Sequence, residues 1–362
     1  MSSGIILVLD GLDDISYGEL DGKTPYDFGK GQNFRFVEGC SESGLLQTIP
    51  EEFIPDTMVG MLTILGVGAD KIPRGRSYLE AISHGIEFGK RDLILRGNYA
   101  MFDELDRLKN PFKVPDSDTV KQVKEYFSHN GMTLHYLDAY RSIIVAKNAS
   151  DFIQNFISFP PHQHIGNAFQ TILSHGNAFA DNLSQITKEL YRQTRPYAVL
   201  PWGESVYEGL PRFSFSAAMV GGTAVVSGIS EMMGMENVVY ESYTGDIDTN
   251  LNSKARIAIE LLKNHQLVVV HIGGTDEATH RRNPREKAAF VEKIDKEVIE
   301  YFVESLPDSS RLLIMSDHCA YCSVGGHGSE PVKFWLYRKN GLPKNVGLVE
   351  NIPAYRLVLG EE

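Results

Sequence analysis

The stretch Gly4–Gly11, GIILVLDG, decides the class of fold. Its apolar run from Ile5 to Leu9 leads into Asp10 and is broken by Gly11. A run without alternating polar residues is typical of a strand that is buried on both faces. It therefore predicts an inner strand of a sheet, with an aspartate at the carboxyl end of that strand.

Three later segments resemble this first run. Each is short and apolar or β-branched, and helical patterns separate them: Thr223–Ser227, Leu267–Ile272 and Leu312–Met315. One of the separating segments, Pro284–Phe302, is amphipathic and is expected to be a helix that faces the core. This alternation predicts an α/β protein with a mainly parallel sheet, whose ligands bind beyond the carboxyl ends of the strands.

The middle third of the chain differs in character from the rest. Between about Gly75 and Pro211 the sequence has helical segments, clusters of basic and aromatic residues, and a proline-rich FPPHQHIG around Pro160 and Pro161. We expect residues 76–211 to form an inserted α+β cap domain. The core would then be discontinuous and consist of residues 1–75 and 212–362.

Composition excludes several classes of protein. The 362 residues carry a formal net charge of −12, which is the wrong sign for nucleic-acid binding. No window approaches 18 apolar residues, and the start of the chain lacks the features of a signal peptide, so no membrane span is expected. Three cysteines are too few for a disulfide framework and favour a reducing compartment, so we expect a cytoplasmic protein.

Metal-binding residue types follow the predicted strands. The segment TDEATH places Asp276 and His280 four residues apart, so that both can face one point. Asp317 and His318 follow the next strand, and His327 lies in the glycine-rich VGGHGSEP. With Asp10 they make three carboxylates and three imidazoles, a set that suits zinc, manganese or a related divalent ion.

The order and spacing of these motifs resemble one family along the whole chain. Outside the metal set the matching segments are MLTILG at 61–66, Gly75–Arg76 before an EA pair, RGNYA at 96–100, Tyr140–Arg141, TGDIDTN at 244–250 followed by Lys254, and GHGSEPV at 326–332. The chain resembles the archaeal-type 2,3-bisphosphoglycerate-independent phosphoglycerate mutases of the alkaline phosphatase superfamily. The resemblance implies an alkaline-phosphatase-like core with an inserted cap.

This resemblance also implies two divalent metal ions, with manganese or zinc expected. One ion would be held by Asp276, His280 and His327. The other would be held by Asp10, Asp317, His318 and the hydroxyl of a nucleophile. Two such ions activate a nucleophile and stabilise charge during phosphoryl transfer.

The nucleophile that the resemblance implies is Thr57, which stands where the family has a serine. The alternative is that Thr57 only caps a helix beginning at Met58. The acid and the histidine that normally follow the nucleophile are Met58 and Met61 here. Apolar volume therefore replaces polar contacts beside the predicted reacting group.

The resemblance assigns the substrate to a small phosphorylated acid, 2- or 3-phosphoglycerate or a close analogue. The residues expected to bind it are Arg76, Arg96, Asn98, Arg141, His162 and Lys254. Arginine suits this role because its planar fork meets carboxylate and phosphate oxygens bidentately. Arg74 is either a further clamp or a solvated loop charge.

Two other functions stay open at this point. One is a metal-dependent phosphatase, phosphonate hydrolase or sulfate-ester hydrolase on the same site, and the other is a non-catalytic homologue. The glycine pairs Gly221–Gly222 and Gly325–Gly326 match no phosphate-binding fingerprint, so no nucleotide cofactor is expected. Cys319 and Cys322 make only half a zinc site, and we interpret their spacing as incidental.

Overall fold

The chain folds into two compact units in a computed structural model that describes residues 3–349 and 352–360. One unit, here the core unit, contains residues 1–72 and 210–362. The other, here the insertion, contains residues 73–209. These limits replace 76 and 211 as the ends of the inserted segment.

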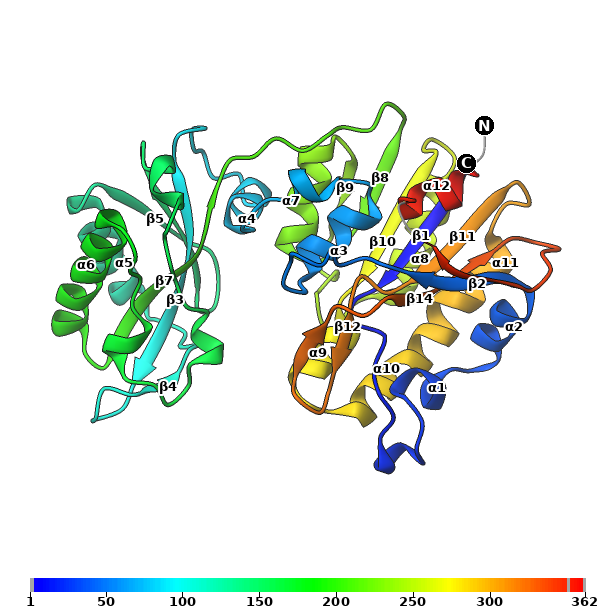
Figure 1. The fold of residues 1–362 in the computed structure, drawn as a ribbon, viewed down its shortest axis with the longest axis horizontal. Coiled ribbons are helices and arrows are strands. Elements are labelled where there is room, and N and C mark those ends of the chain that lie inside the picture. Colours follow the sequence, from blue (N-terminus) through cyan, green and yellow to red (C-terminus); the bar gives the residue numbers. More distant parts are fainter. Residues whose placement is uncertain (1–2, 350–351, 361–362) are drawn as a thin grey trace. The chain divides into compact units, whose positions relative to one another are not determined.

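The core unit is built on an eight-stranded, mostly parallel sheet, with the strand order β15-β2-β14-β11-β1-β10-β8-β9 among the described residues. Its centre is β1 (Ser3–Leu9), which pairs in parallel with β10 (Leu267–Ile272) and β11 (Ser310–Met315) (Figure 1). The outer strands are β8 (Ala217–Val220), β9 (Glu236–Val238), β2 (Ser41–Leu46), β14 (Val332–Tyr337) and β15 (Lys344–Val349). Only the β11–β14 and β14–β2 pairings are antiparallel among these described strands.

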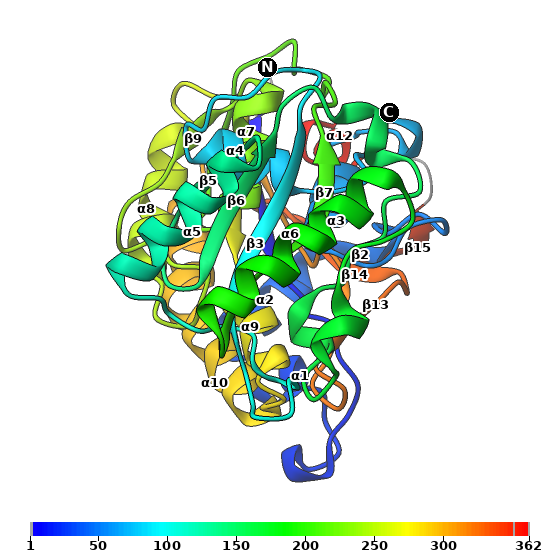
Figure 2. The same cartoon turned by 90° about the vertical axis from the view of Figure 1, so that its left-hand side faces the viewer.

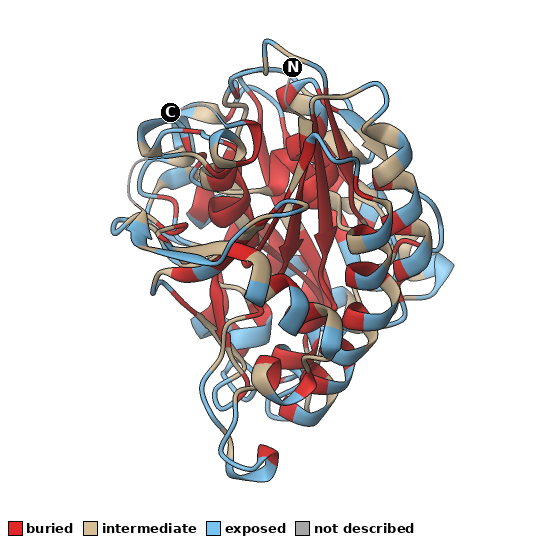
Figure 3. Ribbon diagram, turned by 90° about the vertical axis from the view of Figure 1, so that its right-hand side faces the viewer, coloured by how far each residue is buried: buried red, intermediate tan, exposed pale blue. Residues whose placement is uncertain are grey.

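Helices cover both faces of this sheet, as the unalternating apolar run in β1 predicts. On one face Ile5, Leu7 and Leu9 belong to a cluster with side chains of the long helical segment that follows residue 284. On the other face α12 (Ala354–Leu359) contacts β1 and β11. Figure 3 shows the strands of the sheet buried and the outward sides of the helices exposed. The helices of the core unit are α1 (Pro25–Gly29), α2 (Gln32–Cys40), α3 (Thr57–Ile64), α7 (Ala224–Met233), α8 (Leu251–Leu261), α9 (Gly274–His280), α10 (Pro284–Ile294), α11 (Glu300–Ser305) and α12.

One predicted strand is wrong. Thr223–Ser227 is not a strand: Thr223 is the N-cap of α7, and the parallel strand β8 ends before it at Val220. The β-branched residues of this segment therefore pack as the first turn of a buried helix, because tertiary burial outweighs their local preference for strands. The predicted helix at Pro284–Phe302 is confirmed, since α10 runs through a π-helical turn at Asp295–Ile299 into α11.

The insertion has its own antiparallel sheet and its own core. Its central strand β3 (Leu93–Phe102) pairs with β6 (Arg141–Ala146), β7 (Tyr197–Val206) and the short β4 (Leu108–Asn110), and β5 (Met132–Tyr136) pairs with β6. Helices α5 (Ser117–His129) and α6 (Ala178–Thr194) pack on one face of this sheet (Figure 2). The segment before β3 contains α4 (Ser77–Ser83).

No helix within residues 3–349 and 352–360 has both the length and the apolar character needed to cross a bilayer.

Candidate metal centre

The turn after β1 presents Asp10 at the carboxyl end of the sheet. Gly11 follows in the left-handed region with φ of 61°. A Cβ at Gly11 would lie 2.7 Å from the Cβ of Ala320 and 3.0 Å from Oδ1 of Asp276, so only glycine lets these segments approach so closely. The Gly11 amide donates to Oδ1 of Asp317 at 3.1 Å. This turn therefore brings three carboxylate-bearing segments together.

Helix α9 and a short hairpin supply a second group of residues. Nε2 of His280 lies 3.1 Å from Oδ2 of Asp276, one turn earlier on the same helix. Nε2 of His327 lies 3.1 Å from the other oxygen of Asp276. His327 lies in β13 (Gly326–Gly328), which pairs with β12 (Cys319–Tyr321). A strand-end helix and a hairpin thus converge on one carboxylate.

The end of β11 supplies Asp317 and His318, both fully buried. Nε2 of His318 lies 3.3 Å from Oδ1 of Asp10 and 3.7 Å from Oδ2 of Asp317. The structure therefore brings together every residue that the sequence predicts as a metal ligand.

The three predicted histidine ligands share one orientation. Nδ1 of His280, His318 and His327 each lies 3.1 Å from a backbone carbonyl, of Gly325, Cys319 and Pro55 respectively. A carbonyl only accepts a hydrogen bond, so these contacts place a proton on Nδ1 and make Nε2 the atom that is available to a cation. Histidines that bind metal ions are commonly fixed in this way.

Unsatisfied buried atoms concentrate at this site. Within the described residues, six buried side-chain atoms make no hydrogen bond of regular geometry and have only other groups of this site as close polar neighbours: Asp10 Oδ1, His271 Nε2, Asp276 Oδ1, Asp317 Oδ2, His318 Nε2 and His327 Nε2. Buried polar atoms are rarely left unpaired, so a cluster of them points to a missing binding partner. Three overlapping groups have ligand atoms within 4.8 Å of one another: Asp276–His280–His327, Asp10–His271–Asp317 and Asp10–Asp276–His318. The residues present fit divalent cations.

The electrostatics of the site fit the same conclusion. Burial and the neighbouring charge of Asp10 raise the pKa of Asp317 to about 7. A hydrogen bond to Asp276 raises the pKa of His280 to about 9, against the opposing effect of burial. Protons on the imidazoles thus balance the buried carboxylates when no cation is bound, and a divalent cation would replace those protons.

The hydroxyl of Thr57 faces this site and does not cap its helix. Helix α3 begins at Thr57, and its N-cap is Asp56, whose carboxylate accepts from the Met58 amide at 2.8 Å. The capping alternative for Thr57 is therefore wrong. Oγ1 of Thr57 instead donates to Oδ2 of Asp10 at 3.3 Å. The nearby hydroxyl of Thr63 is already used, because it donates to the Val59 carbonyl at 2.9 Å.

A buried ion pair anchors the hairpin that carries His327. Nζ of Lys287 lies 3.0 Å from Oδ2 of Asp14 and donates to the Ala320 carbonyl at 2.8 Å.

The two cysteines of this hairpin region are buried. Burial raises the pKa of the Cys319 thiol to about 12 and that of the Cys322 thiol to about 11, so both stay protonated at neutral pH. Their contacts are to neighbouring protein groups in the described structure.

Sequence reasoning missed His271. This residue is buried in β10, and its Nε2 lies 3.1 Å from Oδ2 of Asp10. The signal was one imidazole in the otherwise apolar LVVVHI.

Lys254, predicted to bind substrate, is fully buried on α8 and donates to the His271 carbonyl at 3.0 Å. Burial lowers the pKa of Lys254 to about 8.

In the insertion, the predicted substrate residues form a cluster around an indole that sequence reasoning also missed. The guanidinium of Arg96 lies 4.2 Å from the ring centre of Trp202, and the ring of His162 lies 5.8 Å from the same indole. Nε1 of Trp202 donates to Oδ1 of Asn98 at 3.0 Å. Arg76 is connected to this cluster by Glu80, whose carboxylate forms ion pairs with both Arg76 and Arg96.

The other predicted arginines of the insertion have carboxylate or backbone partners. Arg141 forms a two-bond contact with Asp138, both at 2.8 Å. Arg74 donates to backbone carbonyls and lies 3.2 Å from Glu204.

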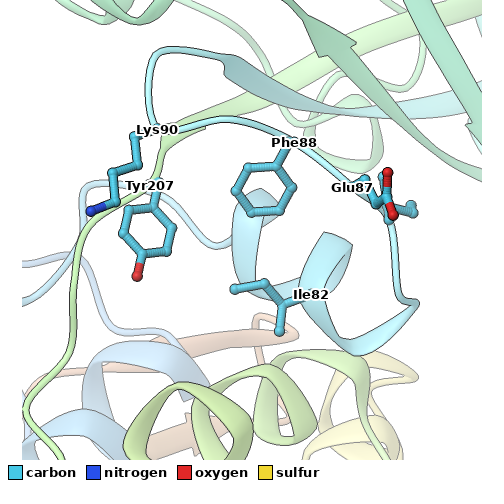
Figure 4. A pocket seen from close by; sticks show the side chains of 6 residues that line it. Ile82, Glu87, Phe88, Lys90 and Tyr207 are labelled. Carbon is cyan, nitrogen blue, oxygen red and sulfur yellow. The ribbon is translucent and has the colours of Figure 1, made fainter.

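A separate shallow pocket of about 590 Å³ is lined by Ile82, Ile86, Glu87, Phe88, Lys90 and Tyr207 (Figure 4). It contains none of the predicted site residues.

Comparisons with known proteins agree with this geometry. The sequence model of the Metalloenzyme superfamily matches residues 2–353. A 2,3-bisphosphoglycerate-independent phosphoglycerate mutase of Saccharolobus islandicus is 30% identical over 363 residues, which cover 92% of this chain and 87% of that protein. The chain belongs to this phosphoglycerate mutase family of metalloenzymes. A second family member, phosphoglycerate mutase 2 of Methanothermobacter thermautotrophicus, is 27% identical and covers 91% of this chain and 87% of its own.

Solved structures show the same fold at lower identity. A protein of Pyrococcus horikoshii is 23% identical with a TM-score of 0.74, covering 93% of this chain and 87% of its own. The cofactor-independent phosphoglycerate mutase of Thermoplasma acidophilum is 18% identical with a TM-score of 0.59, covering 98% and 94%. Membership of this metalloenzyme family supports the use of divalent metal by the phosphoglycerate mutase-like enzyme described here.

Proposed function

We propose that this enzyme interconverts 2-phosphoglycerate and 3-phosphoglycerate through a phosphorylated Thr57. One observation carries the proposal: the Thr57 hydroxyl is not needed as a helix cap and points to Asp10, among the predicted metal ligands. Its position at the start of α3 also places it where backbone amides favour an anionic group.

Two cations would be held by the residues that already converge. Asp276, His280 and His327 form one ligand group, and Asp10, Asp317 and His318 form the other together with Thr57. When bound, the ions would supply positive charge that stabilises the phosphoryl oxygens and lowers the pKa of the attacking hydroxyl. We propose manganese or zinc, which suit mixed carboxylate and imidazole ligands.

The residues of the chain account for the bonds and protons of the reaction. Oγ1 of Thr57 forms a bond to the phosphorus, and the bond from phosphorus to the substrate oxygen breaks. The hydroxyl proton of Thr57 passes toward Oδ2 of Asp10, and the leaving substrate oxygen takes up this same proton, so it leaves as a hydroxyl. The second half runs in reverse with the other hydroxyl of the same glycerate, so no proton or phosphate is gained or lost overall.

Two rival functions have specific observations for and against them. Met58 and Met61 are buried beside Thr57 and replace polar residues of the family, which favours a changed substrate and keeps a metal-dependent hydrolase as the second candidate. A non-catalytic homologue would have no need to keep three imidazoles and three carboxylates poised with unsatisfied buried atoms.

Phosphorus NMR of the purified protein separates these functions. With manganese and 3-phosphoglycerate, we expect the 2-phosphoglycerate signal to appear without a matching rise in inorganic phosphate. Release of phosphate without isomerisation would favour the hydrolase. A panel of other small phosphorylated acids in the same assay identifies the substrate if neither phosphoglycerate reacts.

A further inference from the structure

The β12–β13 hairpin orients three of the predicted metal ligands at once. It carries His327 in β13. The carbonyl of Gly325, at its turn, accepts from Nδ1 of His280 at 3.1 Å. The carbonyl of Cys319, at its start, lies 3.1 Å from Nδ1 of His318. A shift of this hairpin would therefore move one ligand and release two others.

The strands of the hairpin are too short to hold this position alone. β12 and β13 have three residues each, and within the described residues they form a two-stranded sheet of their own. An isolated pair of strands is at best marginally stable in water. The turn is also open to solvent, since Val324 is 60% exposed. Contacts from other segments are needed to fix the hairpin.

A buried ion pair supplies two of these contacts. Nζ of Lys287, near the start of α10, donates to the Ala320 carbonyl at 2.8 Å. Ala320 is the residue that pairs with His327 across the two strands. Oδ2 of Asp14, 3.0 Å from the same Nζ, accepts from the Cys322 amide at 3.3 Å. The pair thus holds the backbone directly opposite and beside the ligand.

Tyr17 extends this network to the turn of the hairpin. Its hydroxyl donates to Oδ1 of Asp14 at 2.7 Å and accepts from the Ser323 amide at 3.0 Å. The side chains of Asp14, Tyr17 and Lys287 therefore contact three backbone groups within four consecutive residues.

The charges of this network favour a role in positioning over a role in stability. The side chains of Asp14 and Lys287 are both fully buried. Apolar side chains of similar volume in place of a buried ion pair often leave a protein as stable as before, or more so. Hydrogen bonds from charged groups, in contrast, are strong and impose a fixed geometry.

Two of the predicted ligands depend most on the hairpin. The side chains of His280 and His327 are 42% and 19% exposed, so packing alone does not hold them. Asp317 and His318 are instead fully buried after the central strand β11. We expect a displaced hairpin to act mainly on the ligand group that contains His280 and His327.

We propose that Lys287, Asp14 and Tyr17 are positioning residues that hold the β12–β13 hairpin so that His327 and His280 bind a divalent cation. This inference rests on the metal ligands of the proposed function, and it is independent of the substrate and of the nucleophile. It can therefore be tested by metal binding alone, without turnover.

The double variant Asp14→Asn/Lys287→Met separates positioning from stability. It removes both charges together, so no unpaired charge stays buried, and the metal-free protein should melt near the temperature of the parent. The donor to the Ala320 carbonyl is lost. The Kd for zinc, measured by calorimetry on the metal-free protein, should rise by about 10–100-fold, as for other residues that orient ligands. The visible absorption bands of the cobalt-loaded variant should also differ from those of the parent, because these bands report the geometry around the ion.

A milder substitution tests the same network if the double variant fails to fold. Tyr17→Phe removes one hydroxyl and should raise the Kd for zinc by about 2–10-fold, the equivalent of a hydrogen bond. Tyr26→Phe is the matched control. The hydroxyl of Tyr26 also donates to a carboxylate that pairs with a lysine, since Glu38 accepts it at 2.9 Å and lies 3.0 Å from Lys30. None of these three residues belongs to a ligand group, so the control should leave the Kd for zinc unchanged.

Three results would overturn the inference. The first is an unchanged Kd for zinc and an unchanged cobalt spectrum in Asp14→Asn/Lys287→Met, even where the melting temperature falls. The second is an equal change of Kd in Tyr17→Phe and Tyr26→Phe. The third, a parent that binds neither zinc nor cobalt, would overturn the proposed ligand groups as well. Failure of the proposed substrate looks different: metal affinity would depend on the network as expected, while phosphorus NMR shows no isomerisation.

Discussion

At the scale of single residues, the candidate metal centre is marked by buried carboxylates and imidazoles whose close polar neighbours are one another. Their carboxylates are crowded as well as buried. Asp317 illustrates the consequence, because burial and the charge of Asp10 raise its pKa to about 7. A buried, crowded carboxylate of this kind lowers the stability of the metal-free protein and binds a cation strongly, a trade-off that is common at functional sites.

The variant Asp317→Asn tests this balance. Its amide oxygen can still accept from the Gly11 and His318 amides, while the repulsion of Asp10 is removed. We expect the melting temperature of the metal-free variant to equal or exceed that of the parent. We also expect the stabilisation by manganese or zinc, which the parent gains by ligand binding to the native state, to be lost. A variant that keeps the full metal-dependent shift in melting temperature would contradict the ligand assignment.

His271 makes a second prediction at this scale. Replacing it by Asn removes the imidazole beside Oδ2 of Asp10, and we expect metal affinity to fall by about 10–100-fold, as for other residues that orient ligands. Calorimetry of metal binding measures this. His265 provides a matched control, because it pairs with Glu236 at 3.1 Å and belongs to none of the ligand groups. Equal losses of metal affinity in His265→Asn and His271→Asn would rule out a specific role of His271 in metal binding.

Single residues also show where prediction from sequence succeeds and fails. Asp10 and Asp317 were predictable because each follows an apolar run, and strand ends meet at one edge of a parallel sheet. His271 was not, because an imidazole inside a buried run has no periodicity that separates a ligand from a core residue. Trp202 was hidden for another reason. Its partner Arg96 is distant in sequence, and only the register of β3 against β7 brings them together.

At the scale of secondary-structure elements, the close packing of α3 against the end of β11 sets the position of Thr57. Gly60 is the point of contact. A Cβ at this residue would lie 2.4 Å from the carbonyl oxygen of Asp317, a backbone atom that cannot move aside. The helix therefore depends on one small residue for its approach to the metal ligands.

Replacing Gly60 by Ala should push α3 away from Asp317. We expect a loss of about 1–3 kcal/mol in the free energy of unfolding, as for other overpacked sites. Metal affinity should fall as well. Gly39 in α2 is the control, because a Cβ there meets no atom within 4 Å and alanine favours helices by up to about 1 kcal/mol. Denaturant unfolding of both variants checks the difference, and similar behaviour of the two would show that the contact is unimportant.

The packing of secondary-structure elements also explains why the predicted strand at Thr223–Ser227 is wrong. The segment Thr223–Ser227 has the composition of a strand, yet it follows the Gly221–Gly222 turn and starts α7. A Cβ at Gly222 would lie 2.3 Å from the Tyr243 carbonyl oxygen, so this turn is set by a tertiary contact. Local propensity carries no information about such a contact.

At the scale of the whole molecule, the predicted metal ligands and the predicted substrate residues Arg76, Arg96, Asn98, Arg141 and His162 belong to different compact units. The addition of metal alone should therefore act on one unit. In hydrogen-exchange mass spectrometry, we expect manganese or zinc to increase protection at residues 10–12, 274–280 and 316–328. Residues 93–102 and 141–146 should show no change. A metal-dependent increase in hydrogen-exchange protection that is confined to the insertion would contradict a metal site in the core unit.

The predicted division of the chain into core and insertion rested on a change in composition, which carries no information about the order of the strands in the antiparallel sheet of the insertion. Its two longest strands, β3 and β7, have ten residues each and pair with one another although the other strands of the sheet lie between them in sequence, so the pairing depends on contacts that local sequence does not reveal.

The most direct test of the account is whether Thr57 becomes phosphorylated during turnover. Rapid quench of the manganese-loaded enzyme with phosphorus-labelled 3-phosphoglycerate, followed by peptide mapping, measures this. We expect the label on Thr57, with Thr57→Ser retaining measurable turnover and Thr57→Ala losing several orders of magnitude. Label on Thr63, or normal isomerisation with no covalent label, would contradict the account.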